Sequence, residues 1–398
     1  MMHFTSGISD AVNAQVAVEA TCRQVKEQLA GAPCHLACVF ASPIYRTSWP
    51  PLLAYVHEQL TPQVLIGCSG SGVIGGGQEL EWVPAISIVG ATLPGVKLFP
   101  FAVTPDELAL SEAGGFWVDK IGASPDAHPN FVVCADPYTC DTLKLLTELN
   151  DTYRSRPMIG GLVSGGDKAG EQFLFLNTEM YAEGAIGVAM TGNITMETIV
   201  SQGCRSVGRP YVITKAEDNI LLQLGGRQAV EVLHEVLFSL SQDDRELAQQ
   251  GSIFVGLVIN EMRSAFASGD FLIRNIVGLD PGTGALAISD RLEVGQTMQF
   301  HLRDAATSRE ELRRLLERRG PSAQAGPPAG ALLFNCTGRG KSLYGTAHHD
   351  VKTIQTIAGK LPIGGFFCNG EIGPIGGINF LHGYTASLGL FRPRGSTG

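Results

Sequence analysis

The chain has 398 residues, a net charge of −9, and a composition in which 44% of residues are hydrophobic and 17% are charged. A chain of this length is too long for one ordinary core and suits two or three domains, and its apolar composition excludes a globally disordered protein. It has no basic run of the kind that neutralises phosphates, because its densest arginine cluster, at residues 309–319, is interleaved with glutamates. Nucleic acid is therefore not an expected partner.

The nine cysteines are scattered and form no CxxC pair with zinc-ribbon spacing. Several lie in apolar runs, which is typical of buried free thiols in a reducing compartment. The opening residues MMHFTSGISDAVNAQ lack the apolar segment of a signal peptide, and no apolar run approaches the roughly 20 residues that cross a bilayer. We expect a cytoplasmic protein without membrane insertion, and neither a metal nor a cofactor is predicted.

In chain order, the predicted elements begin with an apolar strand at 34–42 and an amphipathic helix at 49–60. A Gly-rich apolar run follows at 64–77, and then come the strands AISIVGA and VKLFPFAV. The glycines concentrate at the ends of apolar runs, which indicates tight turns rather than a linker. This order of strand, helix, Gly-rich strand and further strands is the first copy of a repeated pattern.

A second copy follows, with a strand at 130–137, a helix at 139–154 and a Gly-rich strand at 158–166. Leucines three residues apart, at positions 143, 146 and 149, form the stripe expected on a buried helix face. The strands QFLFLN and GAIGVAMTG come next. The second copy therefore has the same order of elements as the first.

A different stretch separates the second copy from the third. It contains the strand NILLQLGG, an amphipathic helix at 227–240, a polar connector at 241–251 and further strands. The third copy then has a strand at 331–340, a helix at 350–359 and the Gly-rich run LPIGGFFCNGEIGP, followed by INFLHGYTASLGLF. We expect the Gly-rich strands at 64–72, 158–166 and 361–370 to end in tight turns and to occupy corresponding topological positions.

These patterns predict an α/β fold with mixed β-sheets covered by outer helices. The sheets are built from the repeated strand–helix–Gly-rich strand–strand units, and short strands that are apolar throughout need cover on both faces. We place the main boundary near residue 218. The predicted parts are an N-terminal segment with a first helix at 1–34, an N-terminal domain at 35–218 and a C-terminal domain at 219–398.

The Gly-rich segments carry a family resemblance. VLIGCSGSGVIGGG, followed by Glu79, resembles the N-terminal module of FIST proteins, while FNCTGRGKSLYG and the stretch from LPIGGFFCNGEIGP to the end of INFLHGYTASLGLF are similar to the C-terminal FIST module. NILLQLGGRQAVEVL also resembles the entry to that module, so the resemblance runs from about residue 35 to 391. FIST proteins are a sensory family of bacteria, also found fused to F-boxes in eukaryotes, and are proposed to bind small ligands such as amino acids.

The resemblance implies an intracellular sensory protein that binds a small ligand. The sequence shows neither an F-box pattern before residue 35 nor a fused kinase or receiver segment, so a signal would leave through a separate partner protein. A protein-interaction scaffold without a small-molecule ligand is a further possibility.

We expect the Gly-rich strand ends to converge on a cleft that binds a small anionic molecule. Glycine lets a ligand approach the backbone closely, and backbone N–H groups that are not paired in a sheet favour an anionic head. Arg339 either adds a bidentate contact to a carboxylate or is an exposed side chain at a turn. The predicted ligand-binding residues are Cys68, Ser69, Ser71, Gly72, Cys336, Arg339, Asn369 and Glu371.

Two nucleotide-binding motifs are incomplete. Gly70, Gly72 and Gly75 form a GxGxxG pattern, but two further glycines discourage the helix that would bind a pyrophosphate, and no acidic residue lies near position 91. TGRGKS resembles a P-loop, yet Asn335 occupies the position of the first glycine in GxxxxGK. Neither motif predicts a nucleotide site here.

A cysteine hydrolase or transferase is the alternative to a binding protein. Cys368 or Cys336 would be the nucleophile, with His382 as the base and Glu371 orienting it, whereas the other interpretation is a buried thiol beside a carboxylate that caps backbone N–H groups. We expect Cys368 or Cys336, which lie beside glycines and polar groups, to react faster with thiol reagents than Cys38 and Cys134, which lie in apolar strands.

The sequence His348–His349–Asp350 resembles a set of metal ligands. Adjacent side chains diverge, however, and Asp350 directly precedes a predicted helix. We therefore expect Asp350 to act as the N-cap of that helix.

Overall fold

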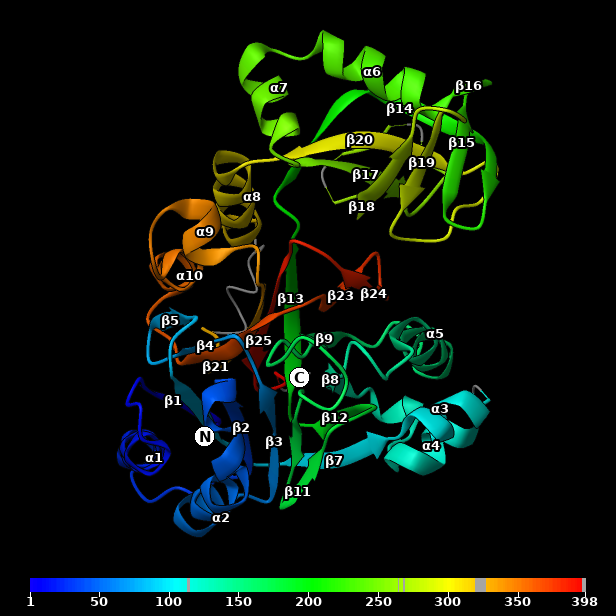
Figure 1. Cartoon of the computed structure of the whole chain (residues 1–398). Coiled ribbons are helices and arrows are strands. Elements are labelled where there is room, and N and C mark those ends of the chain that lie inside the picture. The colour runs from blue at the N-terminus through cyan, green and yellow to red at the C-terminus, as the bar shows by residue number, and fades with distance from the viewer. Residues whose placement is uncertain (113–114, 264, 268, 319–326, 396–398) are drawn as a thin grey trace. The chain divides into compact units, whose positions relative to one another are not determined.

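The computed structural model describes residues 1–112, 115–263, 265–267, 269–318 and 327–395 (Figure 1). The chain divides into two compact units. The core unit comprises Met1–Val200 and Arg313–Gly398, and the inserted unit comprises Ser201–Leu312. The sequence-predicted boundary near residue 218 falls inside the inserted unit.

The core unit contains three copies of one order of elements. Each copy has an edge strand, a helical segment, a central strand, a second helical segment, a Gly-rich strand, a β-hairpin and a closing strand. The first copy consists of β1 (His3–Ser9), α1 (Ala14–Leu29), β2 (Leu36–Ala41), η1 (Pro43–Ser48), α2 (Trp49–Leu60), β3 (Val64–Ser69), β4 (Gly72–Gly75), β5 (Gln78–Glu81) and β6 (Ile86–Thr92).

The other two copies repeat this order. In the third copy the inserted unit follows the edge strand and includes the first part of the first helix, residues 305–312. The second copy consists of β7 (Val96–Val103), α3 (Pro105–Leu110), α4 (Gly115–Ile121), η2 (Pro125–Ala127), β8 (Asn130–Ala135), α5 (Thr142–Thr152), β9 (Met158–Leu162), β10 (Leu174–Leu176), β11 (Glu179–Tyr181) and β12 (Ala185–Gly192). The third consists of β13 (Thr195–Ser201), α8 (Ala305–Glu317), β21 (Gly330–Cys336), α9 (Gly340–Tyr344), α10 (His349–Ala358), β22 (Ile363–Cys368), β23 (Glu371–Ile375), β24 (Ile378–His382) and β25 (Ala386–Arg392).

Each copy is the framework of one six-stranded mixed sheet. The three strand orders are β1-β6-β2-β3-β10-β11, β7-β12-β8-β9-β23-β24 and β13-β25-β21-β22-β4-β5. In all three sheets the Gly-rich strand runs parallel to the central strand, which pairs on its other side with the antiparallel closing strand. This confirms that the three Gly-rich segments are strands in corresponding positions. The expected tight turn follows β3 and β22, whereas β9 is followed by a longer loop, residues 163–173.

The three copies exchange their hairpins. The β4–β5 hairpin of the first copy pairs with β22 of the third, β10–β11 of the second pairs with β3 of the first, and β23–β24 of the third pairs with β9 of the second. Each Gly-rich strand is therefore covered on its outer edge by another copy, so it presents no open edge for aggregation. The exchange also brings the ends of Gly-rich strands from different copies together.

One glycine recurs in each Gly-rich strand, at Gly67, Gly160 and Gly365. A Cβ atom added at any of the three would overlap the carbonyl oxygen of the facing residue in the parallel central strand. Only glycine permits this close approach of the two backbones. The shared constraint gives a structural alignment of the three copies.

The inserted unit is a closed β-barrel. Its strands are β14 (Cys204–Glu217), β15 (Ile220–Leu224), β16 (Arg227–Gln228), β17 (Ile253–Val258), β18 (Phe271–Asp280), β19 (Ala285–Ile288) and β20 (Thr297–Arg303). Strand β14 pairs with both β20 and β15, which closes the six-membered order β14-β20-β17-β18-β19-β15. The expectation of mixed sheets covered by outer helices therefore describes the core unit, whereas it did not include the closed barrel of this unit.

The barrel carries two helices, α6 (Ala229–Ser239) and α7 (Gln242–Gln249). Helix α6 buries Val232, Leu233 and Val236 in the apolar core of the inserted unit. Among the helices that the structure describes, none combines the length and the apolar character needed to span a membrane.

Candidate functional site

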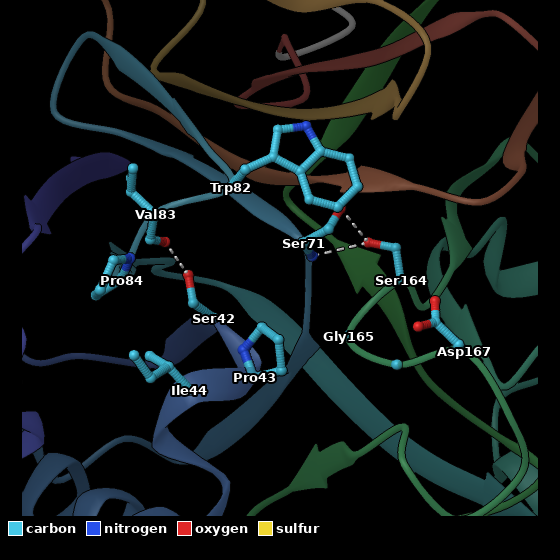
Figure 2. Close-up of a pocket in the computed structure, with 11 residues that line it drawn as sticks. Ser42, Pro43, Ile44, Ser71, Trp82, Val83, Pro84, Ser164, Gly165 and Asp167 are labelled. Atoms are coloured by element: carbon cyan, nitrogen blue, oxygen red, sulfur yellow. Dashed lines mark hydrogen bonds between the residues drawn. The ribbon is translucent and has the colours of Figure 1, made fainter.

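A pocket of about 280 Å³ lies in the core unit, where strand ends of the first and second copies meet (Figure 2). Three segments form it: the residues after β2, the two ends of the β4–β5 hairpin, and the loop after β9. Its lining residues are Ser42, Pro43, Ile44, Ser71, Trp82, Val83, Pro84, Ser164, Gly165, Gly166 and Asp167. Two Gly-rich strand ends, both from the predicted N-terminal domain, meet at this pocket, and no described residue after position 167 lines it.

Ser71 and Ser164 form a hydroxyl pair at one side of this pocket (Figure 2). The backbone N–H of Ser71 donates to the Ser164 Oγ at 3.0 Å, and the two hydroxyl oxygens lie 3.1 Å apart. The Ser164 hydroxyl donates its single proton to the carbonyl of Phe367, so the proton between the two hydroxyls must come from Ser71. The Ser71 Oγ therefore keeps its lone pairs to accept a hydrogen bond from a bound molecule.

The loop after β9 presents a row of backbone donors. Within the described part of the chain, the N–H groups of Ser164, Gly165 and Gly166 have no acceptor, while Asp167 N–H donates to the Glu171 carboxylate at 3.3 Å. Gly165 packs directly on Ser69, where an added Cβ would overlap the serine side chain. Consecutive N–H groups of this kind can bind a carboxylate or another anionic group.

Trp82 forms an apolar wall of the pocket. Its side chain is 73% exposed, and its backbone has φ +58°, a left-handed conformation that a bulky residue rarely adopts. The Trp82 N–H donates to the Ser71 carbonyl at 2.9 Å and closes the base of the hairpin. Because Ile44 and Val83 are also exposed, the wall is uncovered apolar surface that a ligand can bury.

The charge of the pocket differs from the prediction. Asp167 is its one charged lining residue among those that the structure describes, and it brings a negative charge. An anionic ligand would therefore rely on backbone donors alone, whereas an amino group has both Asp167 and the Ser71 Oγ as acceptors.

Of the eight predicted ligand-binding residues, Ser71 lines the pocket. Gly72 follows it and is buried at the start of β4. Asn369 is exposed, and its side-chain amide donates to the Val163 carbonyl at 3.2 Å, beside the pocket loop. Cys68 and Ser69 are buried in β3, where the Ser69 Oγ accepts from the Phe173 N–H at 3.0 Å. These two side chains are parts of the fold rather than of the pocket.

Arg339 is fully buried and is bound by the protein itself. Its guanidinium contacts the Asp350 carboxylate at 2.8 and 3.2 Å and the Tyr344 hydroxyl at 2.6 Å. Although burial opposes the charge, the Arg339 guanidinium holds the pKa of Asp350 below its usual range. Both expectations for this segment are therefore corrected, because Arg339 does not face an open cleft and Asp350 is its ion-pair partner rather than a helix cap.

The N-cap position of α10 is occupied by His348, in a left-handed conformation and without a side-chain capping bond. The described residues contain no cluster of His, Cys, Asp or Glu that could bind a metal ion.

The motif thiols are not exposed. Cys368 is fully buried, its Sγ lies 3.6 Å from the Phe366 carbonyl, and burial followed by the nearby Glu371 charge raises its pKa well above the usual value. Cys336 is also buried. The Glu371 carboxylate accepts from the Thr385 N–H at 3.0 Å, and the His382 Nε2 pairs with the Gly373 carbonyl at 2.9 Å. The expectation of a reactive Cys368 is corrected, and the arrangement fits a buried thiol beside a capping carboxylate.

Sequence reasoning missed Ser164, Trp82 and Asp167, although a signal for Ser164 is present. When the copies are aligned on Gly67, Gly160 and Gly365, the fourth residue after each glycine is Ser71, Ser164 and Asn369. A polar residue thus recurs at one position of the repeat. Since Ser71 and Asn369 were predicted to bind the ligand, the repeat predicts the same role for Ser164. Trp82 and Asp167 have no equivalent signal, because the hairpin closure and the loop path position them.

Comparison with known proteins gives the family. The FIST N domain matches residues 35–227, and the FIST C domain matches residues 229–374. The chain belongs to the FIST family. The whole pocket lies within the FIST N match, and the junction between the two matches lies in the inserted unit, just before α6.

FIST relatives of similar length occur in mycobacteria. An uncharacterized protein of Mycobacterium tuberculosis strain H37Rv is 36% identical over 392 residues, which is 98% of this chain and 100% of the relative. An uncharacterized protein of Mycobacterium bovis is 37% identical over 379 residues, 95% of each chain. The family resemblance noted in the Gly-rich segments is confirmed.

Proposed function

We propose that this FIST protein is a sensory module and that the pocket beside Trp82 binds a free amino acid. The observation that carries the proposal is the combination, in one pocket, of backbone donors without acceptors and a carboxylate. The ligand carboxylate would accept from the N–H groups of Ser164, Gly165 and Gly166. Its ammonium group would donate to Asp167 and the Ser71 Oγ, and its side chain would cover Trp82.

The size of the pocket supports a small ligand. Small-molecule sites usually measure about 300–1,000 Å³, and this one, at about 280 Å³, lies at the lower limit. Asp167 would repel a purely anionic molecule. The proposal therefore narrows the sequence-based expectation of an anionic ligand to a zwitterion that carries both charges.

We also propose that the protein works in the cytoplasm. All nine cysteines are free and buried, which suits a reducing cytoplasm. We infer that the ligand signal passes to a separate partner protein.

Isothermal titration of the full chain against three matched compound sets tests this function. The sets are free amino acids, the corresponding amines without the carboxylate, and the corresponding carboxylic acids without the amino group. We expect at least one amino acid to bind saturably and both truncated analogues to bind at least about tenfold weaker, since each loses one charge-assisted contact. Binding of the carboxylic acid as tightly as the amino acid would exclude the role of Asp167, and no binding in any set would contradict the proposal.

A further inference from the structure

The inserted unit has a pocket of its own, about 370 Å³ in volume, between α6, α7 and the start of β17. We call it the α6–α7 groove. Leu237, Phe238, Ala248 and Ile253 supply its apolar lining, and His234 and Arg245 are its basic groups. None of these residues belongs to the amino-acid pocket of the core unit.

Helix α6 has apolar residues on two sides. Val232, Leu233 and Val236 are buried in the barrel core, whereas Phe238 lies in the groove and is 84% exposed. Burying a Phe side chain is favourable, so a Phe that is exposed beside a pocket forgoes that contribution in the isolated chain. Exposed apolar surface that lines a groove is typical of a binding site for another molecule.

The two basic side chains of the groove are unpaired. Within the described part of the chain, neither the Arg245 guanidinium nor the His234 ring has a hydrogen-bond or ion-pair partner, and no carboxylate lines the groove. Arg205 next to α7 is different, because it pairs with both Asp244 and Asp304. In a chain of net charge −9, this local positive charge is complementary to a carboxylate on an incoming partner.

We propose that the α6–α7 groove binds a short amphipathic helix of a partner protein. Its apolar face would cover Phe238 and Leu237, and one Asp or Glu beside that face would pair with Arg245. A groove between two helices suits a third helix that inserts apolar side chains. This interaction does not depend on the amino-acid pocket.

Acidic residues on α6 and α7 favour a protein segment over an anionic membrane as the partner. Glu231, Asp243 and Glu246 are exposed on the same two helices. They would repel a negatively charged lipid surface, whereas basic residues at the ends of a bound helix would complement them. The expected partner sequence therefore has a central acidic residue, an apolar face and basic flanks.

Peptide display against the full-length protein tests this proposal. A library of helical peptides is selected on the wild type and counter-selected on Phe238→Asp, and enriched peptides are titrated by fluorescence anisotropy. We expect enrichment of an acidic residue one helical turn from an aromatic or aliphatic residue. Phe238→Asp and Arg245→Glu should each weaken binding at least about tenfold.

Val294→Asp provides the matched control, because Val294 is 65% exposed on the same unit but does not line the groove. It should bind the peptide like the wild type, and all three variants should melt at similar temperatures. Changing the acidic peptide residue to lysine should restore binding to Arg245→Glu, which a merely structural role of Arg245 cannot produce.

Several outcomes would overturn the proposal. One is that no peptide is enriched over Phe238→Asp, and another is that the enriched peptides bind Arg245→Glu as well as the wild type. Binding to phosphatidylserine vesicles that Phe238→Asp abolishes would assign the groove to membranes. Concentration-dependent dimerisation that the same variant abolishes would assign it to a second copy of the chain.

Discussion

Trp82 combines an exposed side chain with a left-handed backbone, and the two features have opposite consequences for stability and binding. The left-handed conformation costs a non-glycine residue about 1–2 kcal/mol, and an indole that is 73% exposed contributes little burial in return. Trp82→Gly should therefore raise the free energy of unfolding by about 0.5–1 kcal/mol, after the greater flexibility of glycine in the unfolded chain is deducted. Urea unfolding measures this change.

The same variant should bind the amino acid more weakly, whereas Trp82→Phe should keep most of the affinity because it restores an aromatic wall. Equal affinity in the wild type and Trp82→Gly would remove the ligand role of Trp82. A loss of stability in Trp82→Gly would show that the indole packs on the pocket more strongly than its exposure indicates.

Asp167 tests the charge of the ligand. Asp167→Asn keeps an acceptor oxygen but removes the charge, so the affinity for an amino acid should fall by about tenfold, the lower end of a charge-assisted contact at an exposed residue. Asp151→Asn is the control, because Asp151 is exposed on α5 and lies outside the pocket. Titration calorimetry of both variants should separate them, and equal affinities would leave Asp167 without a role in binding.

Arg339 was predicted either to bind a ligand or to be exposed at a turn, and the structure shows neither. The flanking glycines suggested an exposed turn, but the side chain is fully buried against Asp350. Arg339→Ala should lower the free energy of unfolding by about 3–5 kcal/mol, because it leaves a buried carboxylate without its partner.

The double variant Arg339→Met with Asp350→Leu should recover much of that loss, since removing both charges leaves neither uncompensated. Denaturant titrations of the single and double variants measure the difference. A stable Arg339→Ala protein that no longer binds ligand would restore the original anchor hypothesis.

At the scale of elements, the β4–β5 hairpin links the pocket to two helices. Ser71 and Trp82 stand at its base, and two carboxylates of β5 bind helix starts: Glu79 accepts from the Val351 N–H of α10 at 3.0 Å, and Glu81 accepts from the Lys341 N–H of α9 at 2.9 Å. Acidic side chains suit these positions because their oxygens accept hydrogen bonds from N–H groups that have no partner within the helix. The hairpin is therefore the element through which a bound ligand would affect α9 and α10.

Glu79 makes the stability of the folded protein depend on pH. Burial, and then the nearby Asp350 charge, raises its pKa from 4.5 to about 8. Between these values the folded protein binds a proton that the unfolded chain has lost, so this contribution to stability is complete below about pH 4.5 and falls as the pH rises to 8. The lowered pKa of Asp350 acts below its ordinary value of 3.8 and does not overlap with this window.

Glu79→Gln removes the titration. Relative to the wild type, the variant should gain about 2 kcal/mol or more in free energy of unfolding between pH 5 and pH 8, at roughly 1.4 kcal/mol for each unit of pKa difference. Urea unfolding at four pH values measures this gain. The exposed Glu58→Gln on α2 should show no such trend. A constant difference between wild type and Glu79→Gln would mean that Glu79 is ionised throughout.

The elements of the core unit were largely predictable, but their pairing was not. Apolar runs and glycines located β3, β9 and β22, since period and turn residues are properties of the local sequence. The hairpin exchange depends on which strand edge each hairpin reaches, and local pattern does not encode that choice. Trp82 and Asp167 lie in the pocket because of this tertiary arrangement. The residues next to them in the sequence therefore do not predict their place in the site.

At the scale of the whole molecule, the sequence did not predict that residues 201–312 form a separate unit inserted into the third copy. The sequence predicted the other long barrel strands but not β14, the strand that closes the barrel. Strand β14 pairs with β20, far along the chain, and with β15 across a short turn. The predicted boundary near residue 218 interrupts β14's hairpin with β15. The sequence offered no compositional change at residue 201, where the chain passes from β13 into the inserted unit.

The inserted unit should fold by itself. Its two ends are joined within the unit, because the Glu311 carboxylate accepts from the Ser201 hydroxyl at 3.1 Å and from the Gly203 N–H at 2.5 Å. Its apolar core is supplied by the barrel and α6. A fragment of residues 201–312 should therefore show β-rich circular dichroism and one cooperative thermal transition.

Two leucine variants of that fragment distinguish a packed core from a collapsed chain. Leu286 is fully buried, so Leu286→Ala should destabilise the fragment by about 2–5 kcal/mol, whereas Leu279→Ala, at a residue that is 46% exposed, should have a small effect. If both variants melt like the parent fragment, the fragment lacks specific packing. If no cooperative transition appears at all, the barrel needs the core unit to fold, and the insertion is then one cooperative structure with the repeats rather than a separable module.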